Sequence, residues 1–409
     1  MTGYLPTESG YKRASWALFV AGLATFTMIY CAQPLLPIFA SEFQVTPANA
    51  AMAVSATTIC LGLAGLVYGP LSDAIGRRQV MIASLGASAG LTIASAFVDD
   101  WTHLMILRGL IGLAVAGLPA TTTSYLREEI HPDHASAAIS LFIGGNAIGG
   151  MTGRFVTGAL TSWFGWRWAI AGVGLIGVAS FLMAVVLLPK ARVHVRQPLQ
   201  VRTLTENAVR MATDPGLLRL YATGFCTMGA FVALFNAMSF RLAAPPYSLD
   251  IAVAGAIYLT YAFGSVASTT AGRLWTRFGP RTIVPVAMGI QLVGVLVTGG
   301  EPLWLVVVGS TLVVIGFFAA HGTLAGWVTA RAELLGPGTG QAGALYLFAY
   351  YLGSSVAGTA AGAAWSTGGW TSVIVLTAIM VAVGAGLAAS MRRVPSLKQP
   401  PVDPMEQAA

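Results

Sequence analysis

The chain of 409 residues is 56% hydrophobic, and only 9% of its residues are charged. An ordinary soluble domain has about a quarter charged residues, so this composition excludes a soluble enzyme and indicates an integral membrane protein. The net charge of +7 would favour nucleic-acid binding in a soluble chain. In a membrane chain, the first question is whether the basic residues are concentrated in the loops on one side of the membrane.

Twelve apolar runs are long enough to cross a bilayer as helices, for which about 20 residues suffice. The first run starts at Trp16 and is about twice as long as a secretory signal core, which predicts an uncleaved first helix. Weakly alternating segments typical of a membrane β-barrel are absent, so the sequence predicts an all-α protein. The predicted spans are 16–40, 50–71, 79–98, 101–125, 136–160, 167–188, 217–240, 251–272, 282–299, 302–330, 339–363 and 370–391.

Basic residues are concentrated on the side of this bundle that carries both termini. The loops of the other side contain only Arg167 and Arg241. Because cytoplasmic loops carry the excess of lysine and arginine, both termini are predicted to be cytoplasmic, in a cell inner membrane. Topology thereby explains the positive charge, and no nucleic-acid partner is expected.

The spans divide into two sets of six. We expect a cytoplasmic tail, a six-helix bundle, a basic cytoplasmic linker, a second six-helix bundle and a second tail, at 1–15, 16–188, 189–216, 217–391 and 392–409. Within the linker, Leu199–Met211 fits either an amphipathic helix on the inner leaflet or a flexible tether, and both interpretations stay open.

The two sets repeat each other. An offset of 203 positions places Gly69 on Gly272, Arg78 on Arg281 and Trp101 on Trp304. Parallel repeats of this kind belong to transporters in which one half rocks against the other around a midplane site.

A glycine-flanked basic turn, Gly69-Pro70-Leu71-Ser72-Asp73-Ala74-Ile75-Gly76-Arg77-Arg78, joins the second and third spans. It resembles the G-x-x-x-D-(R/K)-x-G-(R/K)-(R/K) signature of the major facilitator superfamily, and departs from it at Ala74. The resemblance implies twelve transmembrane helices in two pseudo-symmetric six-helix bundles. It also implies a cytoplasmic gate that stabilises the outward-open state and consists of Gly69, Asp73, Gly76, Arg77 and Arg78.

Arg108 interrupts the apolar fourth span, about 10 Å from its outer end. Its surroundings are similar to the family's second signature, whose arginine is associated with proton coupling in drug:proton antiporters. The alternative is a side chain that extends outward to the membrane surface.

The fifth span carries Gly145, Gly149 and Gly153 at a spacing of four, which predicts close helix packing. The same stretch resembles the antiporter signature g-x-x-x-G-P-x-x-G-G, but Gly150 replaces its proline and Arg154 its final glycine. These departures weaken the indication that the protein exports its substrate.

Polar and aromatic side chains inside the spans are the candidates for a substrate and proton pathway. Arg154 shares a helical face with Asn146, although an outward extension of the arginine to the membrane surface is an alternative. His321 is either a proton carrier or a hydrogen-bonded structural residue. The candidates are Tyr30, Gln33, Arg108, Asn146, Arg154, Tyr258, Tyr261, His321, Tyr346 and Tyr350.

The leading functional hypothesis is a secondary active transporter that exports a small neutral or anionic organic molecule, drug- or sugar-like, in exchange for protons. Arginines without a deep carboxylate disfavour permanent cations. The alternatives are a proton-symport permease importing an organic anion or metabolite, and a transporter-like membrane sensor. We expect no catalytic residues, no metal site, no cofactor other than the proton gradient, and a monomer whose partners are its substrate, protons and the lipid bilayer.

Overall fold

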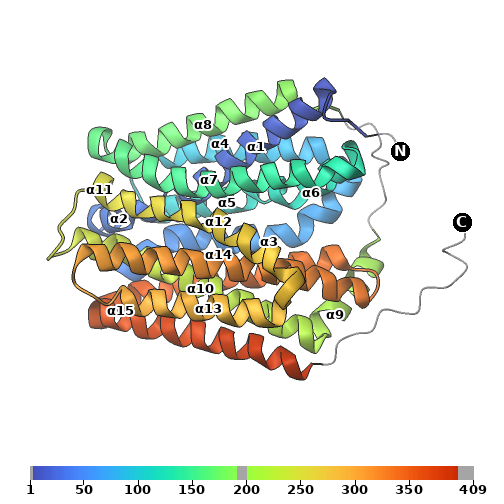
Figure 1. The fold of residues 1–409 in the computed structure, drawn as a ribbon. Helices are drawn as coiled ribbons and strands as arrows, with labels where there is room; N and C mark the ends of the chain where they lie inside the picture. Colours follow the sequence, from blue (N-terminus) through green and yellow to red (C-terminus); the bar gives the residue numbers. More distant parts are fainter. Residues whose placement is uncertain (1–2, 191–199, 395–409) are drawn as a thin grey trace, which may run out of the picture.

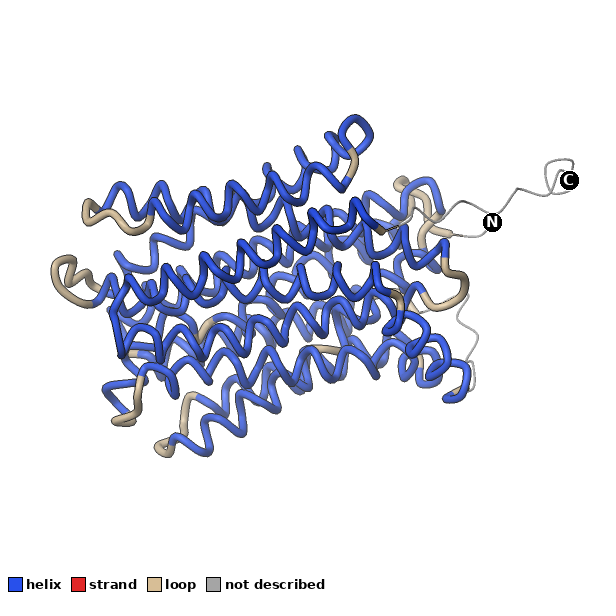
Figure 2. Tube along the Cα trace, turned by 90° about the horizontal axis from the view of Figure 1, so that it is seen from below, coloured by secondary structure: helices blue, strands red, loops and turns tan. Residues whose placement is uncertain are grey.

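The computed structural model describes residues 3–190 and 200–394, which form a bundle of helices (Figure 1). The helices run roughly parallel, and the loops lie at the two ends of the bundle (Figure 2). Ten helical segments of the described residues are long and apolar enough to span a membrane. One of these segments contains two helices joined at a reversal, so the ten segments provide eleven spanning helices. Together with α4 (Arg77–Ser95), which is not among the ten, the bundle has twelve.

The helices of the first half are close to the predicted spans but longer at most ends. The predicted spans are shorter because hydropathy ends at the first polar residues, whereas the backbone hydrogen bonds of the helix continue through these polar end turns. This half contains α1 (Ser9–Tyr30), η1 (Gln33–Leu35), α2 (Leu36–Glu42), α3 (Pro47–Ile75), α4 (Arg77–Ser95), α5 (Trp101–Val115), α6 (Gly117–Glu129), α7 (Pro132–Phe164) and α8 (Trp166–Leu187).

The second half begins with a short helix before its membrane spans. Its elements are α9 (Val201–Thr213), α10 (Pro215–Ala243), α11 (Ile251–Gly255), η2 (Ala256–Tyr261), α12 (Ala262–Phe278), α13 (Pro280–Val297), α14 (Leu303–Leu334), α15 (Thr339–Ser390) and η3 (Met391–Arg393). Helix starts repeat near the offset of 203, as with α4 and α13. The fold is therefore all-α, with twelve transmembrane helices in two pseudo-symmetric sets.

Three predicted spans are interrupted, so their prediction as continuous helices was wrong. The first breaks after Tyr30, where Pro34 starts the one-turn helix η1 and cannot donate a backbone hydrogen bond. The fourth is divided into α5 and α6 at Ala116, whose backbone angles remain helical, and the eighth passes through the 3₁₀ turns of η2. Hydropathy does not register such breaks, because the residues in them are as apolar as their neighbours.

The last two predicted spans are fused in α15, which reverses at Gly368 and Gly369. Gly369 has φ of +58°, a conformation that favours glycine. Both arms pack on α10, where a Cβ added at Gly229 would lie 3.0 Å from the Gly353 carbonyl oxygen and 2.5 Å from Met380. The chain thus returns across the membrane without a polar loop between the arms.

The glycine stripe of α7 lies directly against α1, as predicted. Added Cβ atoms would stand 2.3 Å from the Phe19 carbonyl oxygen at Gly145 and 2.1 Å from that of Leu23 at Gly149. Only glycine permits this approach of two backbones. It fixes the depth of the α1 break relative to Arg154.

Both described chain ends and α9 lie at one end of the bundle, here called the terminal end, and the opposite end is called the far end (Figure 1). Within the described part of the linker, Val201–Thr213 form the helix α9, whose Met211 is buried; its place on the inner leaflet stays a prediction. The linker residues 191–199, the first two residues and the tail beyond Val394 lie outside the described residues.

Candidate functional site

Arg154 of α7 lies at the interface between the two halves and is only 2% exposed. Its guanidinium carbon is 3.9 Å from the ring centre of Tyr30, 4.8 Å from that of Tyr261 and 5.5 Å from that of Tyr258. It therefore does not extend to the membrane surface. Four predicted residues, two from each half, are brought together in one cationic box, in which the ring faces offset part of the desolvation of the charge.

The charge of Arg154 has no carboxylate partner among the described residues. Its Nε donates to Gln33 Oε1 and its Nη1 to the Gly150 carbonyl oxygen. Tyr261, whose ring lies beside the guanidinium, has a buried hydroxyl without a hydrogen-bond partner in the described part of the chain. A buried cation without an anion, next to an unsatisfied hydroxyl, is typical of a site that receives an anionic group.

Gln33 extends the site across the interface between the halves. Its Nε2 donates to Asn236 Oδ1 of α10 at 2.7 Å, and Ser239 Oγ donates to its carbonyl oxygen at 3.0 Å. Sequence reasoning missed Asn236 and Ser239 within their apolar run. The repeat offset could have found Asn236, since it is the position equivalent to Gln33.

A continuous row of rings leads from the arginine box into the second half. Tyr261 lies 5.2 Å from Phe231 between ring centres, and Phe231 stacks on Phe317 at 3.9 Å. Phe317 is parallel to His321 at 5.8 Å, and His321 lies 4.6 Å from Tyr350. This row provides flat faces for a planar ligand.

His321 is hydrogen-bonded within this row, through Nδ1 to the hydroxyl of Tyr346 at 2.9 Å. The two rings stack at 5.8 Å. His321 and Tyr346 therefore belong to the second half alone, and no bond joins them directly to Arg154. The hydrogen bond to Tyr346 therefore occupies Nδ1 of His321.

Arg108 points into the break of α1 and is 1% exposed, so the outward extension considered from the sequence is wrong. It donates to the carbonyl oxygens of Ile29 at 2.6 Å, Ala53 at 2.8 Å and Met28 at 3.2 Å. The break of α1 deprives Met28 and Ile29 of intrahelical partners, and the guanidinium satisfies them. In this geometry Arg108 positions the segment that carries Tyr30 and Gln33.

Asn146 also lies apart from the box, in the packing between two helices of the first half. Its Oδ1 is buried without a hydrogen bond, and a Cβ added at Gly22 of α1 would be 2.2 Å from that oxygen. The side chain thus lies in the contact between α1 and α7, two turns from Arg154 on the same helix.

The predicted gate residues form a separate group at the terminal end. Arg77 pairs with Asp73 at 2.9 Å and with both carboxylate oxygens of Glu128, at 2.7 and 2.8 Å. Arg78 donates to the carbonyl oxygens at the end of α8. All of these contacts join residues of the first half.

Of the two gate glycines, Gly76 has φ of +118° and forms the turn between α3 and α4. Gly69 has nothing within 4 Å of an added Cβ, so the second half does not approach the gate there.

At the far end the halves meet closely along what we call the far-end seam, formed by α3 with α15 and by α7 with α11. Thr58 and Ser355 share a hydroxyl hydrogen bond at 2.8 Å, and Thr359 Oγ1 donates to Ser55 Oγ at 2.9 Å. Ser162 donates to Asp250 at 2.6 Å. Small hydroxyl residues allow the backbones to approach and bond across the interface.

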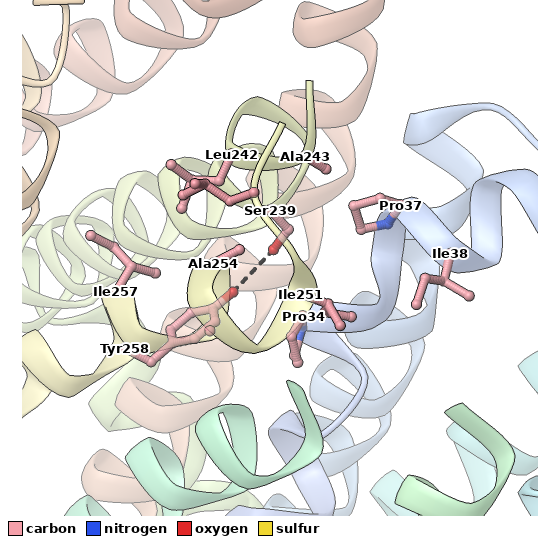
Figure 3. A pocket seen from close by; sticks show the side chains of 12 residues that line it. Pro34, Pro37, Ile38, Ser239, Leu242, Ala243, Ile251, Ala254, Ile257 and Tyr258 are labelled. Carbon is pink, nitrogen blue, oxygen red and sulfur yellow. Dashed lines mark hydrogen bonds between the residues drawn. The ribbon is translucent and has the colours of Figure 1, made fainter. Parts of the chain in front are cut away.

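A small pocket flanks the seam, where the break of α1 faces the end of α10 (Figure 3). It measures about 70 Å³, and the Ser239–Tyr258 hydrogen bond of 3.0 Å forms part of its wall. Its lining is otherwise mostly apolar.

The model of the Major Facilitator Superfamily matches residues 18–244. The chain belongs to this superfamily. It is 41% identical to the inner membrane transport protein YnfM of Escherichia coli, over 91% of this chain and 89% of that protein. It is 36% identical to the uncharacterized MFS-type transporter YybF of Bacillus subtilis, over 95% of each chain. It is thus a multi-pass membrane transporter and not an enzyme.

Two further comparisons concern a more distant relative and the fold. The 4-hydroxybenzoate transporter PcaK of Pseudomonas putida is 29% identical over 42% of this chain and 38% of that protein. A bacterial homolog of the human lysosomal transporter Spinster, solved in an inward-facing and unoccupied conformation, superimposes with a TM-score of 0.77. The superposition covers 96% of this chain and 98% of that one, at 14% identity.

Proposed function

We propose that the protein is a secondary active transporter that moves a small organic anion by alternating access, with Arg154 as the group that binds the anionic end. The observation that carries this proposal is the buried guanidinium at the interface of the halves, with tyrosine rings around it and no carboxylate partner among the described residues. A neutral polar molecule would lack the charge that this arginine requires.

The row of rings beside Arg154 favours a planar substrate, and aromatic carboxylates fit both features. The partial similarity to a protein named as a 4-hydroxybenzoate transporter agrees with this class. The drug- or sugar-like range of the sequence hypothesis thereby narrows to anions with an apolar, flat body.

We infer that the terminal end is cytoplasmic and that this conformation is open to the cytoplasm. The bias of basic residues supports the orientation, and the name of the Escherichia coli relative supports the inner membrane. Hydrogen bonds join the halves in the far-end seam, whereas at the terminal end no described atom lies within 4 Å of a Cβ added at Gly69 or Gly272, apart from the neighbouring backbone of their own helices. The six-helix bundles at 16–188 and 217–391 are the rocking units of this proposal, and a single chain suffices for it.

Proton-coupled efflux is the direction that the charge balance favours. An interior-negative potential of 100 mV already drives a monovalent anion outward by about 2.3 kcal/mol. Import would need at least two protons per anion to be driven by that potential. Each described carboxylate lies near a helix end or in α9, so none is placed inside a span to carry these protons. Proton-symport import of the same class is the second candidate, because Gly150 and Arg154 depart from the antiporter signature and His321 lies within the ring row.

The test is transport by the purified protein in proteoliposomes. Counterflow of radiolabelled benzoate should occur, and benzamide and a quaternary ammonium compound should compete poorly. Arg154→Gln should abolish benzoate exchange, while Arg154→Lys retains part of it because the charge remains. An inward proton gradient should drive uptake in the proton-symport import model, whereas the same inward gradient should drive export in the antiport efflux model.

Equal exchange of benzoate by the wild type and Arg154→Gln would refute the anion assignment. Binding of benzoate without any counterflow would instead support the sensor hypothesis.

A further inference from the structure

Gln33 is bonded on three sides, and the bonds join the anion-binding arginine to the opposite half. Its Oε1 accepts from Arg154 Nε, its Nε2 donates to Asn236 Oδ1 at 2.7 Å, and its carbonyl oxygen accepts from Ser239 at 3.0 Å. Gln33 and Asn236, here called the amide pair, are 0% and 1% exposed. In this conformation water therefore does not reach either partner.

The position of the amide pair is special within the repeat. Its two members are 203 residues apart, the offset that relates Gly69 to Gly272 and Arg78 to Arg281. Equivalent residues of two pseudo-symmetric halves that touch each other lie at the pseudo-two-fold axis. The pair thus lies at the centre of the interface between the two halves.

The amide pair is also continuous with the far-end seam. Asn236 Nδ2 donates to the carbonyl oxygen of Gly358 at 3.4 Å. Gly358 stands between Ser355 and Thr359, which bond to α3 in the seam. Arg154 is consequently connected to the contact that closes the far end through one glutamine and one asparagine.

A carboxylate bound at Arg154 competes with Gln33. Bidentate recognition of a carboxylate uses two parallel N–H groups of the guanidinium. Nη1 is bonded to Gly150 and Nε to Gln33, while Nη2 has no acceptor among the described residues. The Nε–Nη2 edge is the one that a carboxylate can take by displacing a single neutral oxygen, that of Gln33.

We propose that the amide pair is a substrate-controlled contact between the halves. An anion that takes the Nε–Nη2 edge of Arg154 removes the charged donor that orients Gln33, weakens the amide pair and favours opening of the far-end seam. A neutral ligand leaves Gln33 on Arg154 and the far end closed. This inference rests on the proposed anion site and assigns Asn236 as a positioning residue for the conformational change.

The experiment is hydrogen–deuterium exchange of the protein in lipid nanodiscs, with benzoate as the anionic probe and benzamide as the neutral one. Exchange is followed in peptides that cover the seam, at 154–164 and 355–362. In the wild type, benzoate should accelerate exchange of these peptides by about tenfold, a usual size for coupling between sites. Benzamide should leave exchange unchanged.

Asn236→Leu removes the amide contact at nearly constant volume. Its far-end exchange should be fast without ligand and should no longer respond to benzoate, although radiolabelled benzoate still binds. The matched control is Thr359→Val, which removes a hydroxyl hydrogen bond of the same seam; the Thr359 side chain is not among the groups that link Arg154 through Gln33 and Asn236 to Gly358. It should raise the basal exchange and keep the benzoate response.

A ligand-free arm makes the test independent of the probe. Arg154→Met removes the donor to Gln33, so its far-end exchange should already be fast. Its effect should be non-additive with Asn236→Leu and additive with Thr359→Val. Additivity with both, or an Asn236→Leu protein that still responds to benzoate, would overturn the proposal. Failure of the wild type to bind benzoate, with the non-additivity intact, would count against the proposed substrate class alone.

Discussion

The guanidinium of Arg108 donates its hydrogen bonds to backbone carbonyl oxygens and not to a carboxylate. Three backbone oxygens from two helices converge on its guanidinium. A planar fork can serve all of them at once, whereas a lysine ammonium on the same backbone reaches fewer.

Arg108→Lys should therefore destabilise the protein by about 1.5–3 kcal/mol for each charged hydrogen bond that it loses. Because Tyr30 and Gln33 follow directly after the carbonyl groups that Arg108 binds, benzoate affinity should fall as well. Thermal unfolding in detergent and equilibrium binding measure the two effects. A variant with unchanged melting and affinity but altered proton coupling would return Arg108 to the role that the resemblance implied.

Asp73 and Glu128 compete for Arg77, and their exposure predicts different consequences of removal. The side chain of Asp73 is 41% exposed, so its pair with Arg77 contributes less than about 1 kcal/mol to stability. Asp73→Asn should leave melting almost unchanged but slow transport if Asp73 stabilises the outward-open state. Glu128→Gln, which removes the bidentate ion pair with Arg77, should lower the melting temperature more than Asp73→Asn does. Normal transport by Asp73→Asn would refute the gate assignment.

At the scale of elements, the contact between α1 and α7 depends on glycines, which have no side chain and let the two backbones touch. Gly149→Ala would place a methyl group 2.1 Å from the Leu23 carbonyl oxygen, and the helices must separate. Overpacking of this kind costs about 1–3 kcal/mol. Gly144→Ala on the same helix is the control, because an added Cβ there meets nothing within 4 Å. Melting curves should separate the variants; equal stability would contradict the packing.

The junction between the linker and α10 predicts a dependence on pH. Burial raises the pKa of Asp214, but the hydrogen bonds from Arg331 and from the Leu217 N–H outweigh it and keep this pKa below the usual value of 3.8. A lowered pKa in the folded state adds stability above pH 3.8, which is lost as the pH falls through the folded pKa.

Asp214→Asn should therefore remove the acid-side loss of stability while preserving the helix cap. Asp214→Ala should cost about 1 kcal/mol more at neutral pH, because the cap to Leu217 is lost too. Unfolding followed between pH 3 and 7 checks both statements. Identical pH profiles for the wild type and Asp214→Asn would show that the pair with Arg331 adds nothing.

For the whole molecule, the bias of basic residues predicts the orientation in the membrane. Reporter fusions after Arg13, within 195–205 and after Arg393 should all report the cytoplasm, and fusions near Asp99 and Glu301 should report the opposite side. A periplasmic signal at any of the first three sites would contradict the proposed orientation.

The sequence predicted the architecture because repetition and the basic turn are local signals. It named Arg154, Tyr30, Tyr258 and Tyr261 as candidates for one pathway, since polar residues in apolar spans mark such pathways, but it did not predict that they lie side by side. It could not place Arg108, because the break after Tyr30 creates the carbonyl acceptors and leaves no mark in hydropathy. Asn146 shares a face with Arg154, but packing against α1 separates it from the box.

The amide pair has a further consequence for how such a chain could have arisen. In an assembly of two separate six-helix chains, a residue on the two-fold axis would meet its own copy. A carboxylate or an ammonium would repel that copy, whereas a side-chain amide presents one donor and one acceptor and so satisfies itself. Gln33 and Asn236 retain this self-complementary chemistry after their environments have diverged. An ancestral dimer with one amide at this position would have had the same bond across its axis before the two genes were joined.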